Sequence, residues 1–351
     1  MYKNDTLSIE QRIAACKKTG ADWLVYDPAK VSAEPSAKEY KAQRMETMRR
    51  MYKNWHSGLI VDAGAAVCVK EDGTVGFLYE DDGSEERDHP TVQFLLRQKN
   101  VRKIFGGMRT AVVLYRDGTV AVGVHYKETE ERNIIRFAKN LAKCLEPVNQ
   151  WTGVVDIVAD YNMILALHED GRLSCCMEKN DRDVLSWAKR MTGVKDIGMI
   201  SVAFCCRFED GRMDSPSMSL DLEPYKWMKN IGSEHYAVAS SYDFLAGLKH
   251  DGNFTVWYEK GNPDFAAIDG IRSWGKQAVI HAGFNTLLAL APDGEVRAMG
   301  KEADKYKGWT DVALITSARN GVEFAIRWDG SCVGTEGKES TLDFSWVFDA
   351  K

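Results

Sequence analysis

The chain has 351 residues, of which 44% are hydrophobic and 28% are charged, and its formal net charge is −5. This composition is typical of a folded globular protein and excludes an intrinsically disordered chain. The acidic balance argues against a broad surface for nucleic-acid phosphates, and no apolar run approaches the roughly 18 residues of a membrane span. We therefore expect neither nucleic acid nor membrane as a partner.

Two helices are predicted in the N-terminal segment 1–54, which precedes the repeated part of the chain. Ser8 and Gln11 form one capping box, and Ser36 and Glu39 form a second. A loop is expected between the helices, and the second helix should lead directly into the first repeat. The N-terminus has no basic region leading into an apolar stretch, so we predict no secretory signal.

A β-hairpin phrase recurs seven times after this segment. In each copy an apolar run ends in Asp-Gly and another short run follows, which predicts two strands joined by a tight turn. A further short apolar run lies upstream of every copy, so each unit is expected to be an antiparallel meander of at least three strands. The turns begin, at spacings of 36 to 53 residues, at Asp72, Asp117, Asp170, Asp210, Asp251, Asp293 and Asp329.

These repeated meanders predict the fold. One meander cannot bury both of its faces alone, whereas seven meanders stacked radially can. A linear β-solenoid is the alternative, but its usual period is much shorter. We therefore expect an all-β, seven-bladed β-propeller over 55–351, with 1–54 as a helical extension packed on it.

The repeats are joined by helix-like segments rather than by short loops. Apolar residues recur in them at spacings of three and four, which predicts short inter-blade helices that pack one face on the outer rim of the propeller. These segments are 91–100, 128–145, 181–191 and 222–230. The C-terminal run 342–348 predicts a strand that closes the propeller, with Trp346 in the core.

The repeats resemble those of the regulator of chromosome condensation family, whose members form seven-bladed β-propellers. The resemblance covers about residues 55–348 and is best in "WTGVVDIVADYNMILALHEDGRL" and "WGKQAVIHAGFNTLLALAPDGEVRAMG". The family histidine after the Gly-Gly corner is missing from every repeat, and the final Gly-x-Asn is mostly lost. The resemblance implies protein binding, because relatives include guanine-nucleotide exchange factors and a secreted inhibitor of β-lactamases.

Catalytic and metal-binding motifs are not found. The chain has no Gly-x-Ser-x-Gly, phosphate-binding or dinucleotide-binding motif, and its seven histidines are scattered. The eight cysteines follow neither a disulfide framework nor zinc spacing, so reduced thiols in the cytoplasm are expected. The vicinal pairs Cys175–Cys176 and Cys205–Cys206 are interpreted as small core residues, although one cysteine of each pair could meet between blades. No cofactor or metal is predicted.

The corners between the first and second strands are the candidate partner-binding face. Large aromatic residues have little turn propensity, so their presence at tight corners needs either packing over the central channel or a binding surface. Polar neighbours could orient a ligand or a protein loop. The predicted partner-binding residues are Met108, Arg109, Tyr161, Asn162, Tyr242, Asp243, Phe284 and Asn285.

The function expected from these observations is a non-enzymatic scaffold that binds a protein through this face. An exchange-factor-like or inhibitor-like regulator is an alternative. A second alternative is a small-ligand receptor or enzyme at the mouth of the channel, for which Asp160, Asp243 and Arg109 are the candidate polar groups. A third is a structural role in which the N-terminal helices mediate self-association.

Overall fold

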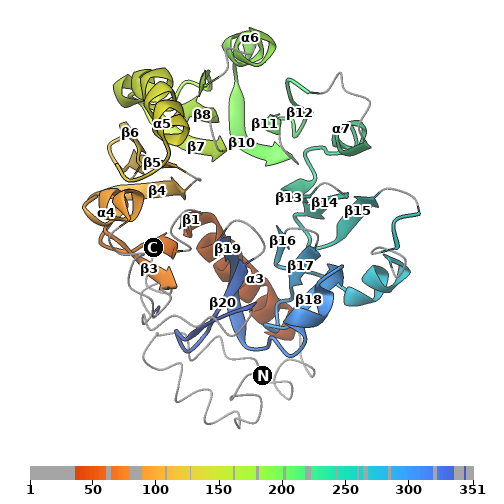
Figure 1. The fold of residues 1–351 in the computed structure, drawn as a ribbon. Helices are drawn as coiled ribbons and strands as arrows, with labels where there is room; N and C mark the ends of the chain where they lie inside the picture. The colour runs from red at the N-terminus through yellow and green to blue at the C-terminus, as the bar shows by residue number, and fades with distance from the viewer. Residues whose placement is uncertain are drawn as a thin grey trace. The chain divides into compact units, whose positions relative to one another are not determined.

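The computed structural model describes most of the chain from residue 36 onward. The described residues are 36–60, 65–79, 89–106, 109–126, 128–160, 163–178, 182–200, 203–217, 223–241, 243–258, 261–263, 268–283, 286–318, 322–335 and 344. They form seven antiparallel sheets of three strands, each in the order of the chain (Figure 1). The seven hairpins and the strand upstream of each are therefore confirmed. The predicted first helix and the strand 342–348, Phe344 excepted, lie outside the described residues.

Two compact units divide the chain, and each is described separately. The unit His56–Ser233 holds four sheets. Their strands are β1 (Ser57–Ile60), β2 (Ala65–Val69), β3 (Val75–Tyr79), β4 (Val101–Gly106), β5 (Thr110–Tyr115), β6 (Val120–Val124), β7 (Val154–Asp160), β8 (Met163–His168), β9 (Leu173–Met177), β10 (Val194–Ile200), β11 (Ala203–Phe208) and β12 (Met213–Asp214). With two residues, β12 is the shortest of these strands, so the fourth sheet has a reduced outer edge.

The other unit combines Met1–Trp55 with Glu234–Lys351 and holds three sheets. Their strands are β13 (His235–Ser240), β14 (Phe244–Lys249), β15 (Phe254–Tyr258), β16 (Val279–Ala282), β17 (Thr286–Leu290), β18 (Val296–Gly300), β19 (Val312–Ala318), β20 (Val322–Arg327) and β21 (Cys332–Gly334). The helix α3 (Ser36–Asn54) belongs to this unit and contacts β16 and β19.

Helices occupy the connections between sheets at the predicted places. They are α4 (Pro90–Leu96), α5 (Arg132–Leu145) with the 3-10 helix η4 (Glu146–Gln150), α6 (Arg182–Arg190), α7 (Glu223–Met228), and the 3-10 helices η6 (Ile268–Trp274) and η7 (Ala303–Tyr306). Several of them cover the outer strand of a sheet: η4 lies on β6, α6 on β9 and η7 on β18. The four helical connections that the sequence predicts are thus confirmed.

The hydrophobic core lies between neighbouring sheets of a unit. In β5, Ala111 and Val113 pack with residues of the preceding sheet and α4, whereas Val112 and Leu114 pack with α5, β7 and β8. A middle strand is therefore buried on both faces. This explains why the middle strands read as continuous apolar runs rather than as alternating ones.

The Asp-Gly turns have one geometry throughout. The glycine φ lies between +76° and +89° in all seven turns, a conformation that L side chains adopt only with strain. The aspartate Oδ1 accepts the backbone N–H two residues further on, at 2.9 to 3.1 Å, in every turn. The turn chemistry inferred from the sequence is confirmed.

The same glycines join one sheet to the next within each unit. The carbonyl of Gly73 accepts the N–H of Val101, and the carbonyl of Gly171 accepts that of Val194, at 2.9 and 3.0 Å. Equivalent bonds run to Gly118 from Val154, to Gly252 from Gln277, and to Gly294 from Val312. These five turns are therefore also the junctions with the following sheets.

Candidate functional site

The two ends of each sheet have different roles. Antiparallel pairing in the order first, second, third strand places the Asp-Gly turns at one end and the corners between first and second strands at the other. We call these the turn end and the corner end. The sequence predicts the partner-binding residues at the corners, and the structure describes two of them, Arg109 and Asp243. Met108, Tyr161, Asn162, Tyr242, Phe284 and Asn285 lie outside the described residues.

Arg109 is the corner residue whose surroundings are best defined. Its Nη1 lies 2.7 Å from Glu130 Oε2, and the two side chains are 14% and 20% exposed. Its carbonyl accepts the N–H of His125 at 3.0 Å, which extends the pairing of β5 with β6 by one residue. The guanidinium is therefore held by a carboxylate, and a partner would meet an ion pair rather than an isolated cation.

The other two polar candidates are less informative. Asp243 is half-buried and directly precedes β14. Asp160 ends β7 and pairs across the corner with Met163 through its backbone. Because Asp243 and Arg109 belong to different units, the channel-mouth site remains a prediction.

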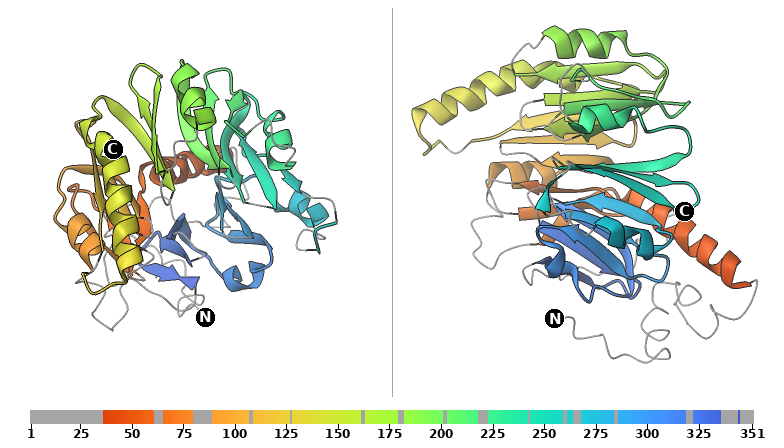
Figure 2. Two further views of the ribbon diagram at one scale, coloured as in Figure 1. Left: turned by 45° about the horizontal axis from the view of Figure 1, so that its top comes forward. Right: turned by 90° about the vertical axis from the view of Figure 1, so that its right-hand side faces the viewer.

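The turn end of the unit that contains β13–β21 carries the helix α3 (Figures 1 and 2). Arg49 donates to three backbone carbonyls there: Nη2 to Lys249 at 3.2 Å, Nη1 to His250 at 2.9 Å, and Nε to Ala278 at 3.0 Å. Its guanidinium also lies 4.5 Å from the centroid of the Tyr236 ring. One side chain thus binds carbonyls of two successive sheets.

Arg44 anchors the same helix to the next two turns. Its side chain is buried, 4.6 Å from the centroid of the Trp328 ring, and its Nη2 donates to the Asp293 carbonyl at 3.4 Å. Nη1 donates to the Tyr40 hydroxyl at 3.3 Å. Burial lowers the pKa of Arg44, an effect that its polar and aromatic partners oppose.

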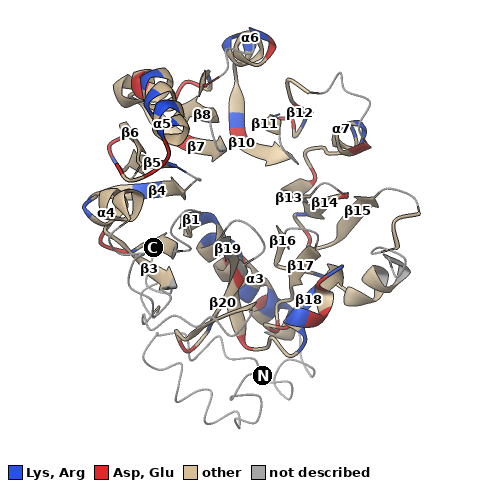
Figure 3. Ribbon diagram, in the orientation of Figure 1, with Lys and Arg blue, Asp and Glu red and all other residues tan. Residues whose placement is uncertain are grey.

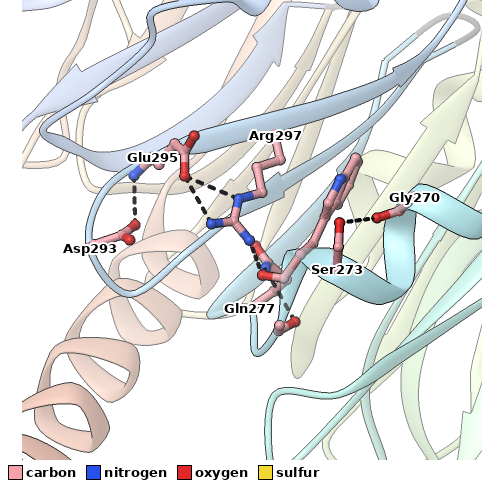
Figure 4. Close-up of polar contacts among 8 residues, drawn as sticks. Gly270, Ser273, Gln277, Asp293, Glu295 and Arg297 are labelled. Carbon is pink, nitrogen blue, oxygen red and sulfur yellow. Dashed lines mark hydrogen bonds and ion pairs between the residues drawn. The ribbon is translucent and has the colours of Figure 1, made fainter.

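The turn beneath Arg44 is itself braced by polar contacts (Figure 4). Asp293 Oδ1 accepts the N–H of Glu295, and the Glu295 carboxylate accepts from Arg297 at 2.9 and 3.1 Å. Arg297 also donates to the Trp274 carbonyl, which accepts from Gln277 Nε2 at 2.8 Å. These bonds join η6 to the β17–β18 turn, whose Asp293 carbonyl accepts from Arg44 of α3.

The buried face of α3 could have been found from the sequence, but the role of its arginines could not. Met48, Met51 and Trp55 follow the 3–4 spacing of a buried stripe, and Arg44 falls on the same stripe. The sequence does not indicate that Arg44 on that stripe contacts a backbone carbonyl and the Trp328 ring.

A half-buried histidine adds to the contact between α3 and β16. His281 in β16 lies with Nδ1 2.8 Å from the Tyr52 hydroxyl. Burial lowers the pKa of His281 to about 4, so the imidazole is neutral at physiological pH.

Near the corner end of the same unit, Glu323 is a second group that sequence reasoning missed. It is 1% exposed, and Tyr306 donates to its Oε2 at 2.7 Å, whereas Oε1 has no hydrogen-bond partner among the described residues. Its carboxyl group occupies the space that a Cβ atom at Gly283 would need, with Oε1 2.5 Å from that position. Burial raises the pKa of Glu323.

The described cysteines and histidines show no catalytic arrangement. Cys68, Cys144, Cys175, Cys176, Cys205, Cys206 and Cys332 are free thiols. Burial raises the pKa of Cys175, Cys205 and Cys206 to about 12, which suppresses the reactive thiolate. Within the described part of the chain, no cluster of His, Cys, Asp or Glu could hold a metal ion. Nor does any helix described there have the length and apolarity of a membrane span.

Comparisons with known proteins identify the class of fold. No protein-family model and no curated protein sequence matches the chain. The CRINKLY WD40 ectodomain of the Arabidopsis thaliana receptor kinase ACR4 aligns with a TM-score of 0.53 at 9% identity, over 83% of this chain and 97% of that one. The ectodomain of the Physcomitrella patens receptor kinase CR4 aligns with a TM-score of 0.52 at 10% identity, over 80% and 73%. WD40 repeats form β-propellers, so the chain has a fold of that class.

The family resemblance is not established by these alignments. Prp20p from Saccharomyces cerevisiae, whose structure was described with its binding to Gsp1p and histones, aligns with a TM-score of 0.44 at 12% identity, over 76% of this chain and 78% of that one. The β-propeller fold rests on the two receptor ectodomains. Membership of the regulator of chromosome condensation family stays a resemblance of the repeats.

Proposed function

We propose that the chain is a seven-bladed propeller that acts as a non-enzymatic scaffold and binds a protein partner through its corner end. The observation that carries the proposal is the position of α3. Arg44 and Arg49 hold this helix on the turn end of three sheets, so α3 occupies that end and the corner end is the one that we propose for the partner. Aromatic and arginine side chains at such an end are the residue types that dominate interface energies.

Seven blades are supported by the repeated junction. Phe344 is buried, and its N–H donates to the Gly330 carbonyl at 3.1 Å, as the first residue of a following sheet does elsewhere. The Phe344 ring packs edge-on against Trp55, with centroids 5.6 Å apart. This supports 342–348 as the closing strand.

The buried free thiols support a cytoplasmic location, and the proposal includes no cofactor.

A capture experiment followed by a titration tests this function. Wild type and the triple variant Tyr161→Ala, Tyr242→Ala, Phe284→Ala are used as baits in native lysate, and captured proteins are identified by mass spectrometry. Phe137→Ala, which removes an exposed ring from α5, is the control. We expect a purified partner to bind the wild type and the control equally and the triple variant at least about tenfold more weakly. Equal binding to all three refutes the corner-end proposal.

A further inference from the structure

A stripe of four cations runs along the solvent face of α5. Arg132, Arg136, Lys139 and Lys143 are all exposed and follow each other at spacings of four, three and four residues. At 100° per residue they lie within an arc of about 60°, and they span about 16 Å of the helix. Ala138, Leu141 and Leu145 are buried on the opposite face. Figure 3 shows the Lys and Arg positions along α5 in blue.

These four cations lack carboxylate partners within the described residues. No ion pair joins any of them to Asp or Glu, and the segment Arg132–Leu145 contains no acidic residue. Other helices differ: Lys226 pairs with Glu223 in α7, and Lys305 pairs with Glu302 beside η7. Like charges at spacings of three and four destabilise a helix by about 0.2–0.5 kcal/mol per pair. An acidic partner would remove this repulsion.

A groove opens beside the C-terminal half of the stripe, between α5 and β6. Its volume is about 320 Å³, at the lower end of the range of ligand pockets. Its lining is mixed: Val122, Val124 and Ala142 are apolar, and Lys143, Glu146 and Asn149 are polar or charged. The outward N–H of Val122 is bound by Asn149 Oδ1 at 2.9 Å, so an occupant would be held by side-chain contacts there rather than by strand pairing.

The stripe and the groove are adjacent on α5. Lys143 belongs to both, and Lys139 lies 5.6 Å from the centroid of the Tyr126 ring, two residues beyond the groove residue Val124. The whole surface, which we call the α5 surface, therefore offers cations along the helix and a groove in which Val122, Val124 and Ala142 can contact an apolar side chain. The helix extends beyond the neighbouring sheets of its unit (Figure 2), and its four cations are exposed.

We propose that the α5 surface binds an acidic polypeptide segment that carries one apolar side chain. The carboxylates of the segment pair with Arg132, Arg136 and Lys139, and its apolar side chain enters the groove. A membrane fits less well because the apolar face of α5 is buried in the protein and cannot insert. A nucleic acid fits less well because the chain has a net charge of −5 and the groove holds the carboxylate of Glu146 beside Lys143.

The test uses the full chain and a fluorescein-labelled peptide of about 14 residues, rich in Glu with one central Leu, with binding followed by fluorescence anisotropy. The α5 variant replaces Arg132, Arg136, Lys139 and Lys143 by Gln. The matched control replaces four exposed cations of α3, Lys38, Lys41, Arg50 and Lys53, by Gln. We expect at least about tenfold weaker binding by the α5 variant and less than about twofold change in the control, with affinity falling as salt rises.

The groove is tested separately with Ala142→Trp, which fills it without changing charge. We expect this variant to bind the Leu peptide about fivefold more weakly and to bind a peptide with Ser in place of Leu as the wild type does. Equal binding by the wild type and the α5 variant, or no binding by the wild type, overturns the proposal. So does tighter binding, through the same four residues, to vesicles with phosphatidylserine or to duplex DNA. The corner-end triple variant should keep full peptide binding, so the two proposals fail independently.

Discussion

Replacement of three glycines of one unit by alanine separates backbone strain from the contact between sheets. Gly153, Gly171 and Gly211 have φ of +62°, +77° and +82°, so alanine is strained at all three. An added Cβ at Gly153 meets nothing within 4 Å. At Gly171 it lies 3.1 Å from Gly193 Cα, and at Gly211 it lies 2.2 Å from the N atom of Ser233. Backbone strain is therefore common to the three alanine variants, whereas the steric overlap of the added Cβ increases from Gly153 to Gly171 to Gly211.

The expected losses follow this order. Strain alone destabilises Gly153→Ala by about 1 kcal/mol, because the left-handed conformation costs about 1–2 kcal/mol and the stiffer unfolded chain offsets part of it. Gly171→Ala adds a tight contact with backbone that must move slightly, for about 2 kcal/mol in total. Gly211→Ala cannot fit without displacing the backbone of 232–233 and should lose about 3–5 kcal/mol.

Urea unfolding followed by tryptophan fluorescence measures these differences as shifts of the midpoint. Gly153→Ala is the internal control, since it changes the same residue type at the same kind of φ without a neighbour. Equal losses in all three variants would refute the steric part of the reasoning. A loss larger at Gly153 than at Gly211 would refute the described approach of the sheets altogether.

Three further expectations can be checked on the same protein. Arg49→Gln removes three hydrogen bonds to carbonyls, so limited proteolysis should cut within α3 faster than in the wild type, while the exposed neighbour variant Arg50→Gln should match the wild type. Burial raises the pKa of Glu323 in the native state. As pH rises from the usual carboxyl pKa to the raised one, the unfolded chain loses this proton while the native protein keeps it, so the free energy of unfolding of the wild type falls. Glu323→Gln should therefore gain stability relative to the wild type as pH rises above the usual carboxyl pKa in urea titrations, and a difference that does not change with pH would contradict this. Cys175, Cys205 and Cys206, whose thiol pKa values are raised to about 12, should resist iodoacetamide at pH 8 until the protein unfolds, as mass spectrometry can show.

The sheets and helices were predictable because they depend on short-range patterns. Asp-Gly after an apolar run specifies a turn, and the apolar run of β5 specifies a middle strand buried on both faces. The 3–4 spacing of α5 likewise predicts its buried side. These features need no knowledge of what lies far away in the sequence.

The polar contacts were not predictable because their partners are distant in the chain. Arg49 binds carbonyls about 200 residues away, and Glu323 is buried against Gly283 and Tyr306 from other segments. A single sequence contains no pattern that joins such residues. The candidate corner residue Arg109 was identified from its position, whereas its pairing with Glu130 requires the structure.

The junction between sheets is made by the main chain: a glycine carbonyl accepts an amide N–H from the following sheet. Such a bond is indifferent to the side chain that follows it, which is valine at three junctions of one unit and glutamine at one of the other. The chain can therefore change most residues of a repeat and keep the joint, provided that Asp-Gly remains. Surface residues can then differ from repeat to repeat without loss of the junction, so each repeat can have its own surface chemistry. The cationic helix α5, between the second and third sheets, is an example.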